Sequence, residues 1–481
     1  MKRNHSLRVF SLVFIVIPVV TKAAVPPPHT VDEQRAWEEK YDKLNIRHSG
    51  KMLSDTTPEF LKVPDNYGDI QDFTVAKTPP TIEFAVVQNL QPEYLSYDLA
   101  RKTGGAWGGW GDVSKGPDGC FYFSISNHLS YGAESYIIRY DSRTKAQKIV
   151  LSAKDLCGWL ADDFGDGKIH GDIDFGPKGD TWVLTYFGPS PTKQEWDDTY
   201  RGSWLLHYNA FTGKGENLGI PLEGTSWPYF NYDWKQDLLF AVDHTGKNVL
   251  AYDTKAGKMV YGGAPPDSII WYARCVLIDH DTNMIYTTDT RSKTKQFIRY
   301  ERRNNEFTRM KATVPVSPKT GKRGDCRAHT ERKDAEGAFW CFDNFGMLFK
   351  FYPDQDRTEY VGENWGKAGY YTANVTMSPK GRYFYYIPGI AEPYGRGVPI
   401  VQYDTRTNKK KVIAFIYDYY LKKYGYGAVR PYGVELDEKG ESLFFYANGG
   451  FHTPEAGPWY EMVMRRAGIF HVHIPAAERA E

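Results

Sequence analysis

Seven copies of one short pattern recur along this chain, and they constrain its fold more than any other feature. Each copy begins with a short strand, a tight turn and an aromatic-rich second strand, as in GDVSKGPDGCFYFSIS and ANVTMSPKGRYFYYIP. A further hairpin follows, of the form apolar-apolar-x-Tyr-Asp-x-x-Thr, as in YIIRYDSRT and PIVQYDTRT. The turns at Gly119 and Gly440 belong to the first and last copies, which gives a spacing of about 53 residues.

A four-stranded unit repeated seven times is typical of a β-propeller, because a single small sheet cannot bury both of its faces. We therefore predict an all-β protein with one seven-bladed propeller over residues 105–481; an array of β-sandwiches is the alternative. The last copy ends at GIFHVHIPAAER, without an obvious fourth strand. A strand at residues 81–88 or 93–97 would complete it and close the ring, which removes exposed strand edges.

The N-terminal 104 residues divide into a targeting segment and an extension of the propeller. Residues 1–24 combine three early basic residues, an apolar run of twelve from Val9 to Val20, and Ala23 and Ala24 as small residues for cleavage. The run is short for a membrane span, so we expect a signal peptide, a secreted or periplasmic protein, and no membrane insertion after cleavage. Residues 25–104 are expected to form a helix over residues 30–44, which starts with a capping box, and an irregular arm.

The charge balance and the aromatic content of the chain indicate which class of ligand it binds. The chain has 60 Lys and Arg against 59 Asp and Glu, so it lacks the basic excess that a nucleic-acid-binding protein needs. Aromatic residues make up 15% of the sequence, with 35 Tyr and 13 Trp. Most of these rings fall in strands, where they pack between sheets. The remainder fall where the inner strands begin, a position from which flat rings can stack on sugars.

Ligand sites of propellers lie on loops at one face of the central funnel. The repeats bring His, Tyr and Arg side chains to that face, a set suited to β-elimination from a uronic acid. There, positive groups neutralise the carboxylate, a His or Tyr removes the neighbouring proton, and another protonates the leaving oxygen. The catalytic candidates are His128, His170, Tyr200, Arg201 and Arg274. The candidates for substrate binding are Trp227, Tyr229, Tyr272, Arg327, Tyr371, Tyr394 and Tyr432.

Two other chemistries stay open. Glycoside hydrolysis needs two facing carboxylates, and Asp112, Asp162, Asp163 and Asp172 are available. A lactonase would also suit a propeller. Both rank below elimination, since the Asp162–Asp163 pair reads as a solvated turn and Asp172 as a structural acceptor.

Five cysteines leave at least one thiol unpaired within the chain, and none has CxxC spacing. Cys326, His329 and Cys341 fall on one expected hairpin, and three such donors fit a zinc site if a fourth arrives from elsewhere. A satisfied core cluster is the alternative. The elimination chemistry itself requires no cofactor, and a structural divalent cation, zinc or calcium, would be additional.

The blade motif KIHGDIDFGPKG, the YDxRT third strands and the closing HVHIPAAER resemble a family of secreted bacterial propellers described as streptogramin-lyase-like or gluconolactonase-like. The His, Tyr and Arg of the funnel resemble those of seven-bladed polysaccharide lyases such as ulvan lyases. That resemblance implies β-elimination on an acidic polysaccharide. Gluconolactonase-type relatives hold a metal with Glu, Asn and Asp in six blades, whereas this chain has seven copies and no clear inner-strand Glu.

The sequence thus predicts a secreted polysaccharide lyase whose partner is an acidic, uronate-containing polysaccharide, with a monomer as the favoured state. The alternative is a non-catalytic propeller that binds glycans or proteins, or a propeller hydrolase or lactonase.

Overall fold

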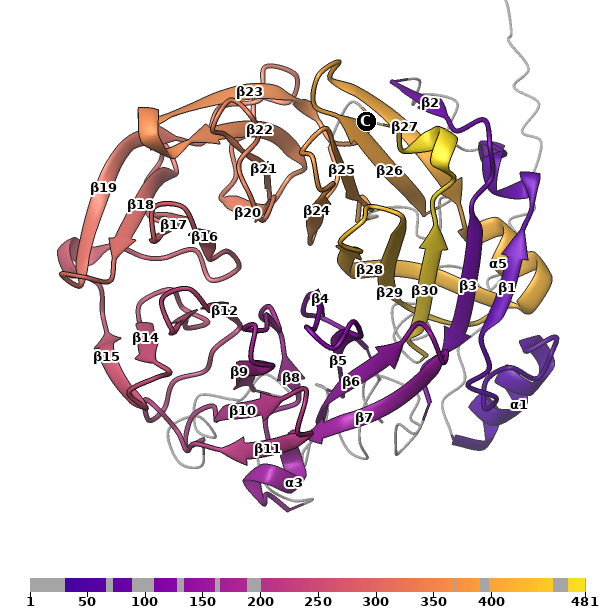
Figure 1. Ribbon diagram of the computed structural model, residues 1–481, viewed down its shortest axis with the longest axis horizontal. Coiled ribbons are helices and arrows are strands. Elements are labelled where there is room, and N and C mark those ends of the chain that lie inside the picture. Colours follow the sequence, from indigo (N-terminus) through magenta and orange to yellow (C-terminus); the bar gives the residue numbers. More distant parts are fainter. Residues whose placement is uncertain are drawn as a thin grey trace, which may run out of the picture.

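The computed structural model describes residues 31–65, 72–88, 108–127, 134–160, 165–187, 200–366, 369–389, 398–452 and 466–480. Seven sheets stand around a central axis, each with its first strand innermost (Figure 1). The sheets are antiparallel throughout, apart from one added outer strand. The predicted fold class, an all-β seven-bladed propeller, is confirmed.

The first four blades each have four strands in sequence order. Blade one consists of β4 (Val113–Lys115), β5 (Phe121–Ser126), β6 (Ser135–Asp141) and β7 (Ala146–Ser152). Blade two consists of β8 (Lys168–Ile169), β9 (Asp180–Tyr186), β10 (Leu205–Asn209) and β11 (Lys214–Asn217). Blade three consists of β12 (Tyr229–Asp233), β13 (Leu238–Val242), β14 (Val249–Asp253) and β15 (Lys258–Gly263). Blade four consists of β16 (Leu277–Asp279), β17 (Met284–Thr288), β18 (Gln296–Glu301) and β19 (Glu306–Thr313).

The last three blades follow the same plan, and blades six and seven have additions at the outer edge. Blade five consists of β20 (Cys326–His329), β21 (Phe339–Asp343), β22 (Met347–Tyr352) and β23 (Arg357–Glu363). Blade six consists of β24 (Val375–Met377), β25 (Tyr383–Tyr386), β26 (Pro399–Asp404) and β27 (Lys409–Phe415). Blade seven begins with β28 (Tyr426–Leu436), β29 (Ser442–Phe451) and β30 (Gly468–His473).

Blade seven is completed from the N-terminal side of the chain. Strand β3 (Thr81–Val86) pairs antiparallel with β30, so the first of the two segments offered by the sequence closes the ring (Figure 1). The segment expected to be an irregular arm also contains β1 (Leu53–Thr56), which pairs with β3, and β2 (Phe73–Val75), which runs parallel to β27. Blades six and seven therefore have five strands each.

Short helices pack on the outside of the propeller. The N-terminal helix α1 (Val31–Tyr41) is anchored on blade seven, where Trp37 Nε1 donates to the Phe451 carbonyl at 3.0 Å. Its Glu38 forms an ion pair with Arg466 at 2.9 Å, with both side chains buried. The other helices are α3 (Ala153–Cys157), α5 (Tyr417–Tyr424) and the 3-10 turns at Pro58–Leu61, Pro266–Ser268, Pro353–Gln355 and Ala476–Glu478. Among the described residues, no helix is long and apolar enough to cross a membrane.

The core lies between neighbouring blades, and aromatic side chains fill much of it. Phe297 of blade four stacks on Phe351 of blade five, with ring centroids 3.9 Å apart. Phe121 of blade one stacks on Phe444 of blade seven at 4.6 Å, across the closure. Offset aromatic pairs of this kind add about 0.5–1.5 kcal/mol beyond their area burial. The aromatic excess of the sequence is thus largely used to hold blade against blade.

Turn chemistry explains where the strands end. In the first blade Gly119 adopts φ 79°, a conformation that residues with a Cβ rarely take. The Asp of each Tyr-Asp-x-x-Thr segment caps an outer turn, as Asp404 accepts a hydrogen bond from the Arg406 backbone N–H at 2.9 Å. The repeated motifs are therefore fold-forming.

Candidate functional site

The inner strand of blade two places four polar side chains on one side of the backbone. The segment Lys168–Asp174 alternates strictly: Lys168, His170, Asp172 and Asp174 are separated by Ile169, Gly171 and Ile173, and both isoleucines are fully buried. Side chains two residues apart in an extended segment share a face, so the polar set points toward the central axis. A Cβ on Gly171 would lie 2.5 Å from the Phe230 carbonyl oxygen, so glycine permits the close approach of blade three.

Basic side chains from three blades meet at the N-terminal ends of the inner strands, which we call the funnel mouth. Arg274 Nη1 donates to His170 Nε2 at 2.6 Å, joining blades four and two. Arg327 of blade five donates from Nη1 to the Arg274 carbonyl at 3.1 Å. Lys168 lies beside His170 on the same strand. We call Lys168, His170, Arg274 and Arg327 the basic cluster.

Aromatic rings surround the basic cluster. The Tyr186 ring has the Lys168 ammonium 4.9 Å from its centroid and the Arg274 guanidinium at 5.9 Å. Arg327 lies 5.0 Å from the ring of Tyr371 and donates from Nε to its hydroxyl at 2.5 Å. The cations are thus held by ring faces and by one another, interactions that fix their positions without neutralising their charge.

Among the described residues, Lys168, Arg274 and Arg327 form no ion pair within 4.0 Å, although the charge of Arg327 lowers the pKa of the nearby Asp172. Burial, followed by the charge of Arg274, lowers the pKa of Lys168 to about 7. Burial and the charges of Arg274, Lys168 and Arg327 hold the pKa of His170 well below its usual value, so its ring is neutral at pH 7. This partly buried excess of positive charge favours an anionic ligand.

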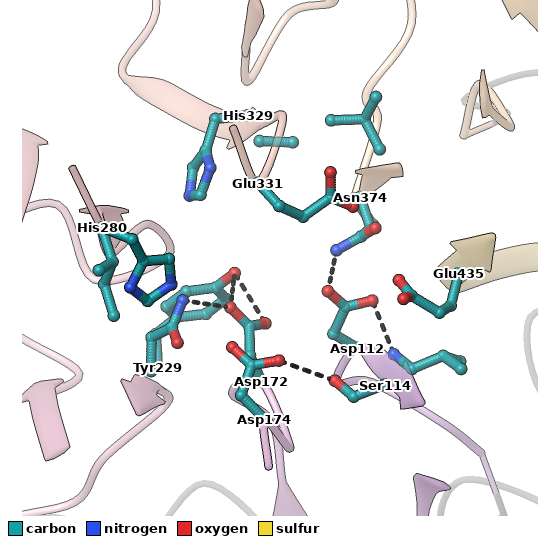
Figure 2. Close-up of a pocket in the computed structure, with 16 residues that line it drawn as sticks. Asp112, Ser114, Asp172, Asp174, Tyr229, His280, His329, Glu331, Asn374 and Glu435 are labelled. Atoms are coloured by element: carbon teal, nitrogen blue, oxygen red, sulfur yellow. Dashed lines mark hydrogen bonds between the residues drawn. The ribbon is translucent and has the colours of Figure 1, made fainter. Parts of the chain in front are cut away.

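Further along the same inner strands the charge reverses. A cavity of about 110 Å³ is lined by residues of all seven blades, and five carboxyl groups converge on it: Asp112, Asp172, Asp174, Glu331 and Glu435 (Figure 2). Tyr229 donates to Asp172 at 3.1 Å and Asn231 Nδ2 donates to it at 3.0 Å. Ser114 donates to Asp174 at 3.0 Å, and Asn374 donates to Asp112. We call the five acids, Asp112, Asp172, Asp174, Glu331 and Glu435, the acidic ring.

The acids of this ring raise one another's pKa. Burial and then the charge of Asp172 hold the pKa of Asp112 well above its usual value. Burial followed by Asp174 does the same for Asp172. Burial followed by Glu331 raises the pKa of Glu435. Like charges in a low-dielectric channel disfavour full ionisation, so the shifts favour the protonated forms of these acids.

Two of the predicted catalytic residues, His170 and Arg274, are brought into direct contact. Tyr200 is instead buried against Tyr186 and Phe187, where it donates to Asp166 at 3.0 Å and contacts Ser203 at 2.8 Å. This hydroxyl is held by structural partners, and burial holds its pKa well above its ordinary value. Arg201, the next residue, is exposed. His128 lies outside the described residues.

Four of the predicted substrate-binding residues lie at the funnel mouth. Arg327 and Tyr371 are bonded to each other, Tyr229 lies under Arg327 at 5.9 Å, and Tyr272 lies near both arginines, whose charges act on its hydroxyl. The prediction that Trp227 binds substrate is wrong, because its side chain has no exposed surface and belongs to the core of blades two and three. Tyr432 packs on Trp110, with centroids 5.3 Å apart. Tyr394 lies outside the described residues.

Lys168 and Tyr186 are members of the site that the residue types alone did not single out. Lys168 could have been found from the alternation of KIHGDID, which places it on the face of His170. Tyr186 lies at the end of the second strand of its blade and pairs in register with Lys168. Of the acids considered for hydrolysis, Asp112 and Asp172 lie in the acidic ring, while Asp162 and Asp163 lie outside the described residues.

The three predicted metal ligands gather with a fourth donor. His329 and Cys341 are register partners in blade five, and Cys326 Sγ lies 3.9 Å from Sγ of Cys275 in blade four. His329 Nδ1 donates to the Thr330 carbonyl at 3.1 Å, which leaves Nε2 facing Cys275. The contacts run in a chain from His329 through Cys275 and Cys326 to Cys341. No three of these donor atoms lie within 4.8 Å of one another, so zinc would require side-chain rotation, and calcium prefers oxygen ligands.

The fold and the site define the class: a seven-bladed β-propeller whose funnel has a basic, aromatic mouth above an acidic channel. No protein-family model matches the chain, and no curated protein matches it at a significant level. Among solved structures, one described as the structure of U3-55K covers 81% of this chain and 98% of its own, at 8% identity and a TM-score of 0.48. A crystal structure of the RRP9 WD40 repeats covers 84% of this chain and 100% of its own, at 8% identity and a TM-score of 0.48.

Proposed function

We propose that this protein is a glycan-binding propeller that holds the carboxylate of a uronate-containing polysaccharide in its basic cluster. The observation that supports this proposal is the gathering of three cations at the funnel mouth, the buried Arg327 and the half-buried Lys168 and Arg274, which have no ion-pair partner among the described residues. Arg274 and Arg327 present planar donor forks, which suit a carboxylate, and Lys168 adds a point charge. The rings of Tyr186, Tyr229 and Tyr371 around them offer faces for a pyranose.

Binding would couple to proton uptake at the mouth. Burial and Arg274 lower the pKa of Lys168 to about 7 in the absence of a ligand. A carboxylate nearby favours the charged ammonium, so the ligand raises this pKa and binds best to the protonated site.

Cleavage by β-elimination is the second candidate function, and one contact favours it. His170 is neutral at pH 7, and its Nε2 lone pair accepts from Arg274. A uronate carboxylate that took over the Arg274 donor would release this lone pair beside the sugar. The guanidinium would then neutralise the carboxylate while His170 removed the adjacent proton. The tyrosine hydroxyls at the mouth are the available acids.

The test separates binding from cleavage. The full chain without residues 1–24 is titrated with a panel of uronate polymers and with neutral glycans, while absorbance of the unsaturated uronate is followed. Saturable binding of uronate polymers without new absorbance supports the binding propeller, and rising absorbance supports the lyase. If the protein binds none of the uronate polymers, both proposals are wrong.

An exported location accords with this ligand, because acidic polysaccharides are extracellular polymers. We propose that residues 1–24 direct export and are then removed. N-terminal sequencing of protein recovered outside the cytoplasm of the producing cell should begin near Val25. Retention of Met1 in that protein would contradict the proposal.

A further inference from the structure

A separate cluster of metal-binding side chain types lies at the seam where the ring closes. Strand β3, from the N-terminal side of the chain, pairs with β30, from its C-terminal end (Figure 1). Glu83 of β3 stands directly opposite His471 of β30, and His473 lies two residues further along. Residues two apart on a strand share a face, so both imidazoles lie on the side of Glu83.

The distances within this cluster are those of metal ligands. Glu83 Oε2 lies 3.4 Å from His471 Nδ1 and 3.5 Å from His473 Nε2, and the three donor atoms are all within 4.8 Å of one another. These separations are long for hydrogen bonds, whose donors and acceptors usually approach to about 2.9 Å. They match the edge of roughly 3.3 Å in a zinc tetrahedron with bonds of about 2.0–2.1 Å.

The surroundings orient the ligands. Lys145 of blade one donates to Glu83 Oε1 at 2.5 Å, which leaves Oε2 to both imidazoles. The His471 ring packs near Phe121, with centroids 5.8 Å apart, and its side chain is 6% exposed. The His473 side chain is 46% exposed, which gives a metal access from solvent.

We propose that Glu83, His471 and His473 form a binding site for a zinc-like divalent transition metal that clips the first strand of the ring to the last. Two imidazoles and one carboxylate are a common zinc ligand set, and water would complete the coordination. Glu83 and His471 are 388 residues apart in sequence. The site therefore exists only when the ring is closed, and a metal bound to it stabilises the closed ring by mass action.

The test uses the full chain without residues 1–24, stripped with a chelator and titrated with zinc chloride. Wild-type protein should bind zinc at this site and melt at a higher temperature when zinc is added. His473→Gln should lose one zinc equivalent and show a smaller zinc-dependent rise in melting temperature than wild type, because its site is at least about tenfold weaker. His48→Gln, which changes an exposed histidine of the N-terminal arm, is the matched control and should behave as wild type.

A second variant separates this site from the cysteine cluster of blades four and five. Cys341→Ala should retain the zinc equivalent that His473→Gln removes. With cobalt in place of zinc, the seam site should give only weak visible bands, because it contains no thiolate. Equal zinc binding by His473→Gln and wild type would overturn the proposal, and so would loss of all zinc in Cys341→Ala with its fold intact by circular dichroism.

Discussion

The two levels of the central funnel carry opposite charge, although they are built from the same strands. In blade two, Lys168 and His170 lie at the mouth, and Asp172 and Asp174 lie further along in the channel. In blade five, Arg327 lies at the mouth and Glu331 in the channel. A step of two residues along an extended strand moves a side chain by about 7 Å without changing its face. The sign of the charge is therefore set by depth in the funnel.

This contrast shows which level is suited to an external anion. The acids of the channel accept hydrogen bonds from neighbouring side chains, and burial together with their mutual charge raises their pKa values. The cations of the mouth form no ion pair among the described residues and are held by tyrosine rings, although the charge of Arg327 also acts on Asp172. Substitutions at the mouth should therefore have the largest effects on ligand affinity. Substitutions in the channel should change the stability of the protein and leave its affinity unchanged.

The largest effect is expected from Arg327→Met. Loss of a buried guanidinium that binds a carboxylate costs about 2–5 kcal/mol, or roughly 30-fold to more than 1000-fold in affinity. Titration calorimetry with a uronate oligosaccharide measures it. Arg303→Met removes the same charge from an exposed outer turn and should leave affinity unchanged. Equal affinity in both variants would show that the mouth does not bind the carboxylate.

The next effect is a pH dependence that originates in Lys168. Its pKa of about 7 in the unliganded protein rises when an anion binds, so binding takes up a proton. Affinity should be constant below pH 6 and then fall by up to about tenfold per pH unit above pH 7. Lys168→Met should bind more weakly and show no such fall between pH 6 and 9. A wild-type affinity that rises with pH in this range would contradict the assignment.

A smaller effect is expected from the cysteine cluster. Cys275 directly follows Arg274 and Cys326 directly precedes Arg327, so a zinc held by these thiols would fix the spacing of the two arginines. Cys326→Ser should lower zinc content by one equivalent and weaken the binding of a uronate oligosaccharide by about tenfold or less. Elemental analysis and calorimetry on the same samples measure both. Unchanged zinc content would show that the cluster is a packed core.

The architecture was predictable from sequence because turn glycines and alternating strands recur in every copy. The site was predictable in part. His170, Arg274, Arg327 and Tyr371 stand at the starts of inner strands, so the repeat alignment places them together. Tyr200 and Trp227 were misplaced, because a Tyr or Trp next to a loop has the same local pattern whether it faces the funnel or the core. The approach of Cys275 to Cys326 depends on the packing of two blades, which no local pattern records.

The smallest effect should come from the channel, and it tests whether the two levels act independently. Burial and Glu331 raise the pKa of Glu435, so the folded state favours its protonated form. Its contribution to stability is therefore complete at acid pH and falls as pH rises above the pKa of about 4.3 of an unfolded Glu. Glu435→Gln should melt like wild type at pH 4 and about 2 °C higher at pH 8, with unchanged affinity for a uronate oligosaccharide. Glu438→Gln, whose carboxylate is 81% exposed beside Lys115, should show no such difference. If Glu435→Gln instead alters ligand affinity as strongly as Arg327→Met, mouth and channel form one site.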